Sequence, residues 1–305
     1  MSGRFALAAA LAVMAIALAL VTPSLAATKP AIAAPYPATV TADNGKVTIR
    51  KRPSRIVSLS PTATETLFAI GAGGQVVAVD DQSDYPKQAP HTSLSGYTPN
   101  VEAIASYRPD LVVAASDPKD LVSALRTLGI PVILQDAPST IPGAYGQIRQ
   151  LGVATGHAED AGSLVARMQA RIGRIVATRR PGAAGASVYH ELDPTFFSAS
   201  SKTFVGRVYA LFGLKNIADA APGGPYPQLS PEFIVASSPD LVVLADSVCC
   251  GQTPGTVAAR PGWSGIKAVR SGSILRIDDS IASRWGPRLV NFVRAVGTAL
   301  RRLEG

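Results

Sequence analysis

Charged residues are scarce in this chain of 305 residues. Lys, Arg, Asp and Glu together make up 16% of the sequence, whereas hydrophobic residues make up 47%. This composition excludes an intrinsically disordered protein, because disordered chains combine low hydrophobicity with high charge. The formal net charge is +8, and a basic balance can indicate binding to nucleic acid or to a membrane surface. No basic strip with interleaved aromatic residues is present, so we do not expect nucleic acid as a partner.

Cysteine is almost absent. The only two cysteines are adjacent, Cys249 and Cys250. Kept reduced, they form a reactive dithiol; oxidised, they close a vicinal disulfide, although neighbouring Cα atoms lie about 3.8 Å apart, closer than in most disulfides. We predict the disulfide, either as an inert clip in a loop or as a rigid ring that presses on a ligand.

The sequence also lacks the motifs of common enzymes. It contains no Gly-x-Ser-x-Gly nucleophile turn, no His-Glu-x-x-His pair and no phosphate-binding glycine loop. The three histidines, His91, His157 and His190, are widely spaced. We therefore expect neither catalysis nor a resident metal or cofactor.

Residues 1–26 are predicted to be an export signal. Arg4 supplies the positive charge, an apolar run from Phe5 to Val21 follows, and small residues favour cleavage after Ala26. The alternative is an uncleaved signal that anchors the chain, since the apolar run approaches the length of a membrane span. No cysteine follows this run closely, which argues against a lipid anchor. Residues 27–46 are predicted to be a flexible lead-in, and we expect the protein in the periplasm or cell envelope, an oxidising compartment.

Two segments of the chain repeat one pattern. Residues 101–116 read VEAIASYRPDLVVAAS, and residues 231–246 read PEFIVASSPDLVVLAD. In each, a short amphipathic helix ends before a proline, because the residue preceding proline resists the helical conformation. The Leu-Val-Val run that follows is typical of a strand covered on both faces, as in a parallel sheet. Two copies in equivalent places indicate two similar α/β lobes.

A long helix is predicted between the two copies, from about Ala158 to Arg179. Leu164, Met168 and Ile172 recur at four-residue steps and form one apolar stripe. Pro181 and Gly182 end the helix. The sequence therefore predicts an N-terminal lobe over 47–156, a linker helix over 157–181 and a C-terminal lobe over 182–305.

The chain resembles the substrate-binding proteins of ABC importers for cobalamin, ferric siderophores and haem. The matching segments occur in order over nearly the whole chain after the predicted signal and read RIVSLSPTATETLFAIG, SDYP, NVEAIASYRPDLVV, LGIPVI, PYPQLSPEFIVASSPDLVV and ASRWGPR. The resemblance implies two Rossmann-like lobes with parallel central sheets, joined by one long helix, with the ligand between them. It also implies a permease dimer and its ATPase as partners. Cobalamin is the first ligand expected, a ferric siderophore the second and haem the third; an envelope receptor or scaffold without transport is the alternative.

The resemblance also assigns roles to individual residues. Glu65 and Glu232 match positions at which family members dock onto arginines of the permease, and the alternative is that each only caps its own helix. Ligand contacts are expected from loops at the carboxyl ends of strands, where open α/β sheets bind ligands. These loops offer aromatic side chains that suit a large flat ligand, and an arginine. The candidates are Tyr85, Tyr97, Phe196, Phe197, Tyr226, Arg284 and Trp285.

Two of these candidates bear on the choice of ligand. Tyr97 and Tyr226 stand where the cobalamin binders that this chain resembles often have tryptophan, which weakens the cobalamin assignment. Haem would require His or Tyr as an axial ligand, and Tyr85, Tyr97 and His190 are the candidates for it. Trp263 is assigned to the core.

Overall fold

The computed structural model describes residues 36–179 and 184–303, and these belong to one compact unit. The predicted export signal and residues 27–35 of the lead-in lie outside the described residues. Within the described part, no helix is both long and apolar enough to cross a bilayer.

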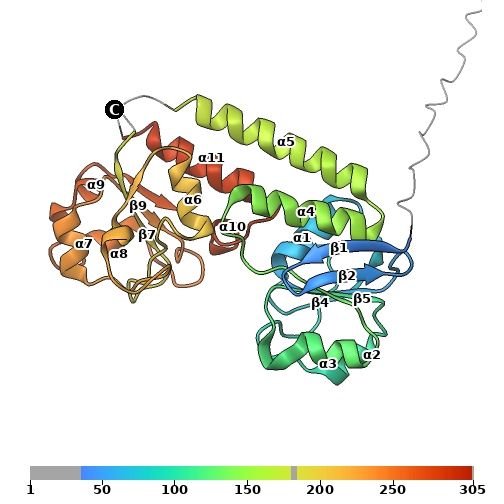
Figure 1. Ribbon diagram of the computed structural model, residues 1–305. Helices are drawn as coiled ribbons and strands as arrows, with labels where there is room; N and C mark the ends of the chain where they lie inside the picture. Colours follow the sequence, from blue (N-terminus) through green and yellow to red (C-terminus); the bar gives the residue numbers. More distant parts are fainter. Residues whose placement is uncertain (1–35, 180–183, 304–305) are drawn as a thin grey trace, which may run out of the picture. The chain divides into compact units, whose positions relative to one another are not determined.

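The N-terminal half is built on a four-stranded parallel sheet with the strand order β4-β3-β5-β6 (Figure 1). Its strands are β3 (Ile56–Leu59), β4 (Val76–Val79), β5 (Leu111–Ala114) and β6 (Val132–Leu134). Its helices are α1 (Pro61–Ala69), α2 (Val101–Ser106), α3 (Leu121–Thr127) and α4 (Ile141–Thr155), with 3-10 turns at Gly73–Gln75 and Pro118–Asp120.

The C-terminal half repeats this arrangement with the strand order β10-β9-β7-β8, again parallel. Its strands are β7 (Ser187–Glu191), β8 (Lys215–Asn216), β9 (Leu241–Leu244) and β10 (Ile274–Arg276). Its helices are α6 (Phe204–Ala210), α7 (Pro231–Ser237), α8 (Pro254–Ala258), α9 (Lys267–Arg270), α10 (Asp279–Ala282) and α11 (Leu289–Leu300), with 3-10 turns at Ile217–Ala220 and Trp263–Gly265.

The aspartate of the repeated Pro-Asp-Leu-Val-Val segment has the same function in both halves. Asp110 accepts hydrogen bonds from the backbone N–H groups of Ser54, at 2.9 Å, and Arg55, also at 2.9 Å. Asp240 accepts from the N–H and the hydroxyl of Ser187, both at 2.8 Å. Each carboxylate thus fastens the amino ends of two neighbouring parallel strands, which explains why the segment occurs twice.

Helix α5 (Ala158–Ala177) connects the halves and lies along α4 and α11 (Figure 1). Its buried side chains include Val165, Met168 and Ile172. Gly152 of α4 permits the close approach, since a Cβ there would meet the Cβ of Ala161 at 2.4 Å. One continuous hydrophobic core runs from the first sheet through α4, α5 and α11 to the second sheet. The parallel sheets and the single connecting helix confirm the predicted fold class.

An antiparallel hairpin precedes the first sheet. The sequence predicts a short strand over Lys46–Arg50, which matches the second strand of this hairpin, but it does not predict the first. The strands of the hairpin are β1 (Ala38–Ala42) and β2 (Gly45–Ile49). The predicted lead-in over 27–46 is therefore wrong for residues 38–46. Val40, Val47 and Ile49 are buried, while Thr39, Thr41, Lys46 and Thr48 are exposed. This two-residue alternation is that of a half-buried strand.

Candidate functional site

Exposed apolar side chains gather at the carboxyl edges of both sheets. Among the described residues, six large hydrophobic side chains have more than a third of their surface exposed: Tyr85, Tyr97, Leu128, Phe197, Tyr226 and Val248. All except Leu128 lie in loops that follow a strand. Tyr85 and Tyr97 follow β4, Phe197 follows β7, Tyr226 lies between β8 and α7, and Val248 follows β9. Single exposed apolar residues need no explanation. Five at the edge where α/β sheets bind ligands indicate an apolar binding surface.

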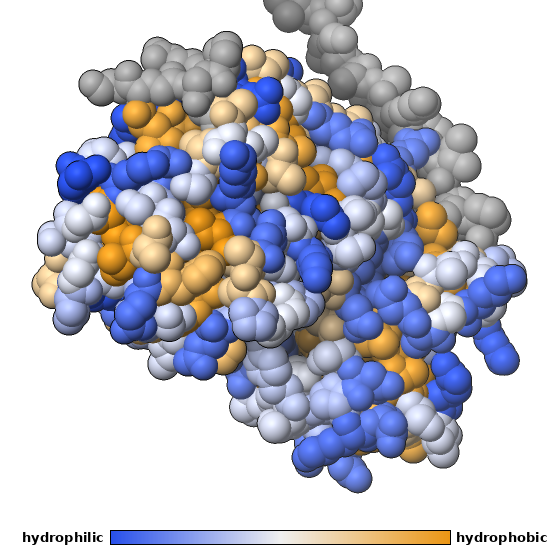
Figure 2. Space-filling model, turned by 60° about the vertical axis from the view of Figure 1, so that its left-hand side comes forward, coloured by the Kyte–Doolittle hydropathy of each residue, from blue (hydrophilic) through white to orange (hydrophobic). Residues whose placement is uncertain are grey.

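On one face, the surface of the protein is mixed in character. Figure 2 shows hydrophobic residues emerging as separate patches among hydrophilic ones on the face displayed. A surface of this kind suits an amphipathic ligand, because aromatic rings supply flat apolar area and the tyrosine hydroxyls supply hydrogen bonds.

Four of the predicted ligand residues are exposed at this edge: Tyr85, Tyr97, Phe197 and Tyr226. Phe196 is not among them, since it packs against Trp263 with ring centroids 6.0 Å apart, beneath the Arg260 guanidinium. The backbone explains the divergence between the two adjacent phenylalanines: Phe196 has a φ of 70°, in the left-handed region, which turns its side chain into the core.

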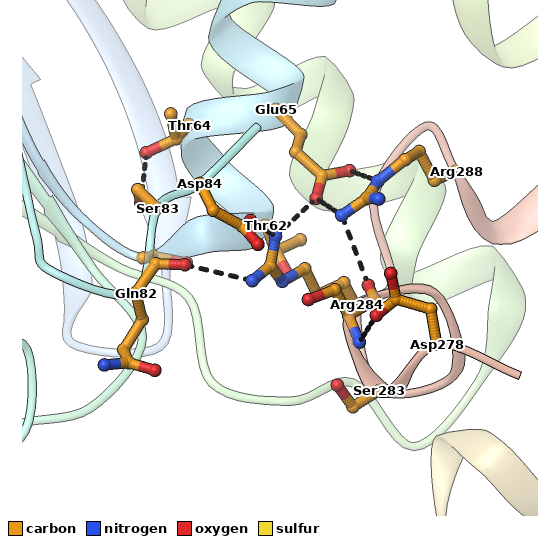
Figure 3. Close-up of polar contacts among 12 residues, drawn as sticks. Thr62, Thr64, Glu65, Gln82, Ser83, Asp84, Asp278, Ser283, Arg284 and Arg288 are labelled. Carbon is orange, nitrogen blue, oxygen red and sulfur yellow. Dashed lines mark hydrogen bonds and ion pairs between the residues drawn. The ribbon is translucent and has the colours of Figure 1, made fainter. Parts of the chain in front are cut away.

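The segment Ser283–Arg288, which contains the predicted Arg284 and Trp285, binds the N-terminal half (Figure 3). Arg284 donates to Glu65 at 3.0 Å, to Asp84 at 2.6 Å and to the carbonyl of Gln82 at 2.9 Å. Trp285 donates from its indole nitrogen to Gln147 of α4 at 2.7 Å. Both side chains therefore hold the halves together, and Arg284, with 12% of its side chain exposed, does so at the loop that carries Tyr85.

Arg288 completes this cluster. Its guanidinium donates to both carboxylate oxygens of Glu65, at 3.0 and 2.6 Å, and lies 4.5 Å from the centroid of the Tyr85 ring. Burial opposes ionisation of Asp84, but the hydrogen bond and charge of Arg284 outweigh it and lower the pKa of Asp84. The cluster is thus charged, and charge-assisted hydrogen bonds of this kind are the strong ones.

The sequence interpretation required Glu65 to point outward for docking, but the side chain is buried. Only 2% of the residue is exposed, because α1 packs it beneath the Arg284–Arg288 segment. The helix cap comes from Ser60, whose hydroxyl accepts from the N–H of Ala63. Glu232, in contrast, is exposed at the start of α7. The two carboxylates are also not equivalent in the repeat: the counterpart of Glu232 is Glu102 in α2.

A second buried carboxylate cluster lies at the carboxyl edge of the other sheet. Arg260 donates to both oxygens of Glu191 at 2.6 Å, and the Tyr189 hydroxyl donates to the same carboxylate at 3.1 Å. Asp246 is fully buried nearby, and neither of its carboxylate oxygens has a hydrogen-bond partner among the described residues. Burial, followed by the charge of Glu191, raises the pKa of Asp246 to about 7.

Sequence reasoning missed this second cluster. Glu191 is the last residue of the buried strand β7 and Asp246 lies just after the buried strand β9, positions that the sequence could have indicated. Arg260 stands 69 residues after Glu191, so no local pattern connects the two.

Cys249 and Cys250 are exposed free thiols in this structure. Their loop is held by backbone N–H groups of Cys250 and Gln252 that donate to the carbonyl of Asp246. Burial, together with the neighbouring Cys250, raises the pKa of the Cys249 thiol to about 12. Since the thiolate is the reactive form, Cys249 is a poor nucleophile at neutral pH. The vicinal disulfide stays a prediction.

His190 belongs to the core and does not face the exposed edge. It is fully buried, its Nδ1 is hydrogen-bonded to the hydroxyl of Tyr209, and burial lowers its pKa to about 3. It is therefore wrong as a candidate axial ligand for haem, and Tyr85 and Tyr97 remain. Over 36–179 and 184–303, no three His, Cys, Asp or Glu side chains are placed to hold a metal ion.

Comparison with known proteins places the fold and the site in context. A family model described as "Periplasmic binding protein" matches residues 56–281. The chain is 31% identical to the uncharacterized ABC transporter substrate-binding lipoprotein YvrC of Bacillus subtilis, over 85% of this chain and 83% of that protein. It is 30% identical to the vitamin B12-binding protein of Pectobacterium carotovorum, over 83% of this chain and 90% of that protein. The periplasmic heme-binding protein RhuT from Roseiflexus, in its apo form, has a TM-score of 0.74 and 25% identity, covering 83% of this chain and 100% of that one.

Proposed function

Because this chain belongs to the periplasmic binding protein family, we propose that it captures cobalamin or a related large metal chelate and delivers it to an ABC permease with its ATPase. The observation that carries the ligand class is the group of exposed aromatic side chains at the carboxyl edges of both sheets. Family members are substrate-binding proteins and not enzymes, and we infer that this chain likewise has no catalytic role. We place it in the periplasm or cell envelope, exported by its N-terminal signal.

The choice of cobalamin rests on the vitamin B12-binding relative, which matches along most of both chains. Haem is supported by the similarity to RhuT and by the exposed Tyr85 and Tyr97, whose phenolic oxygens can ligate iron. A ferric siderophore suits the same aromatic edge. A receptor or scaffold without transport would use the same ligand surface and would lack only the permease.

Replacing Tyr97 or Tyr226 with alanine is expected to weaken ligand binding about tenfold each, because each change removes an exposed aromatic contact worth about 1–2 kcal/mol. The probes are cyanocobalamin, a ferric chelate and haemin. Intrinsic fluorescence quenching and visible absorption spectroscopy identify which of them binds and measure its dissociation constant. Leu128→Ala is the matched control, since Leu128 is also exposed and apolar but lies at the end of α3. Equal weakening by the control, or no binding of any probe, would refute the proposed ligand surface.

We further propose that Glu232 docks onto the permease. It is exposed, and no described residue forms an ion pair with it. Docking through Glu65, by contrast, requires that its carboxylate first leave Arg284 and Arg288. Charges at the rim of an interface set its register and association rate.

Glu232→Arg is therefore expected to lower ligand uptake by cells carrying the importer at least about tenfold, while ligand affinity stays unchanged. An exposed carboxylate outside the repeat gives the control, Glu159→Arg, which also reverses a charge at the start of a helix. If uptake is unaffected by Glu232→Arg, or falls equally with the control, Glu232 has no docking role.

A further inference from the structure

A hollow lined by described residues lies away from the aromatic edge. It is a groove of about 730 Å³ between strand β2 and the amino ends of β5 and β6. One wall is formed by residues 46–51; the other by Pro109, Asp110, Arg126 and the turn Gly129–Val132. Asp110 and Pro131 immediately precede β5 and β6, so this groove opens at the edge of the sheet opposite to the ligand loops.

The groove is strongly basic. Lys46, Arg50, Lys51 and Arg126 line it, all four are exposed, and none forms an ion pair with a described residue. Asp110 is the one carboxylate in the lining, and its oxygens already accept hydrogen bonds from Ser54 and Arg55. The net charge of the groove lining is therefore positive, and it favours an anionic ligand.

The groove also contains an open strand edge. β2 pairs with β1 on one side only, and no described strand pairs with its other side. In an antiparallel strand, alternate residues direct their N–H and C=O groups to each side. The five residues of β2 thus offer an unpaired edge about 17 Å long.

One end of the groove is closed by Asn44. Its side-chain amide donates to the carbonyl of Val132 at 2.9 Å, and its oxygen accepts from the N–H of Leu134 at 3.2 Å. Asn44 therefore stands where a neighbouring strand would stand beside β6. Beyond it, β2 and the turn before β6 separate, and the hollow lies between them.

We propose that this groove binds an extended acidic peptide segment of a partner protein, which adds as a strand to the free edge of β2. The backbone of the segment pairs with β2, while its carboxylates meet the four cations. A flat anionic membrane would contact the exposed cations but would leave the free edge of β2 unpaired. The inference goes beyond the proposed ligand and does not depend on it.

The test uses the full exported chain and a fluorescein-labelled peptide of alternating Glu and Val, roughly twelve residues long so that it extends past β2. Fluorescence anisotropy is expected to show saturable binding that weakens with added salt. The double variant Lys46→Glu/Arg50→Glu is expected to weaken binding at least about tenfold. The control Arg270→Glu/Arg276→Glu, an equal charge change at exposed positions of the other half, should leave it unchanged.

A second peptide, methylated on all of its backbone nitrogens, separates strand pairing from charge attraction. It keeps its carboxylates but lacks the N–H donors, and it should bind much more weakly. Equal binding of the two peptides, equal loss in the control variant, or no binding of the acidic peptide would each overturn the proposal. Binding to phosphatidylglycerol vesicles that depends on Lys46 and Arg50, without binding of the peptide, would assign the surface to a membrane instead.

Discussion

Glu65→Gln is expected to lower the free energy of unfolding by about 3 kcal/mol. The substitution keeps the shape of the side chain but removes its charge, and it leaves two partly buried guanidinium groups without their shared carboxylate. Breaking a buried ion pair from one side typically costs about 3–5 kcal/mol. The lower end applies, because Arg284 retains Asp84 and the Gln82 carbonyl. Urea denaturation followed by circular dichroism measures the change.

Two further variants make this result specific. Glu232→Gln removes an exposed carboxylate and should change stability by less than about 0.5 kcal/mol. The double variant Glu65→Gln/Arg288→Met also removes the guanidinium that Glu65→Gln leaves unpaired. It should recover part of the lost free energy of unfolding, since a buried ion pair and a well-packed apolar substitute often give similar stability. A stability of Glu65→Gln equal to that of Glu232→Gln would show that the cluster does not hold the halves together.

Asp246→Asn is expected to stabilise the protein at pH 8 and to leave its stability at pH 4 nearly unchanged. Burial raises the folded-state pKa of Asp246 to about 7, from an ordinary value of 3.8. A raised pKa means that the stability present at acidic pH is lost as pH rises from about 4 to about 7, because the folded state must then ionise a buried carboxyl beside Glu191. At about 1.4 kcal/mol for each pKa unit, the difference at pH 8 is on the order of 4 kcal/mol.

The measurement is the unfolding free energy from pH 4 to pH 8 for both proteins. Asp80, whose pKa burial raises to about 6, adds to the same decline in both, so the difference between them isolates Asp246. Asp120→Asn, at an exposed position, controls for the loss of a carboxylate. Parallel pH profiles for the wild type and Asp246→Asn would mean that Asp246 is ionised in the folded protein throughout this range.

Features that depend on neighbouring residues could be predicted from the sequence. The apolar stripe of α5 and the strands after Pro109 and Pro239 follow from local spacing and backbone chemistry. The exposed tyrosines could be placed because strand ends determine which loops share an edge. The ligand itself could not be predicted, since aromatic residues at this edge suit corrinoids, haem and siderophores alike.

Pairings between distant residues could not be predicted in this way. Arg284 and Glu65 are 219 residues apart. Arg284 was assigned to the ligand, and Arg288 was given no role, because nothing local in the sequence indicates that either binds an internal carboxylate. The same holds for Arg260 and Glu191. Strand β1 was missed because it is short and lies within a segment whose composition is that of a linker.

The paired aspartates Asp110 and Asp240 imply a division of labour along each strand. Both sets of hydrogen bonds lie at the amino ends of the strands, so these aspartates are remote from the loops proposed to bind the ligand. A change of cargo then requires new side chains only at the far ends of the strands, and the scaffold tolerates it. An architecture divided in this way can serve many importers while its framework sequence stays recognisable.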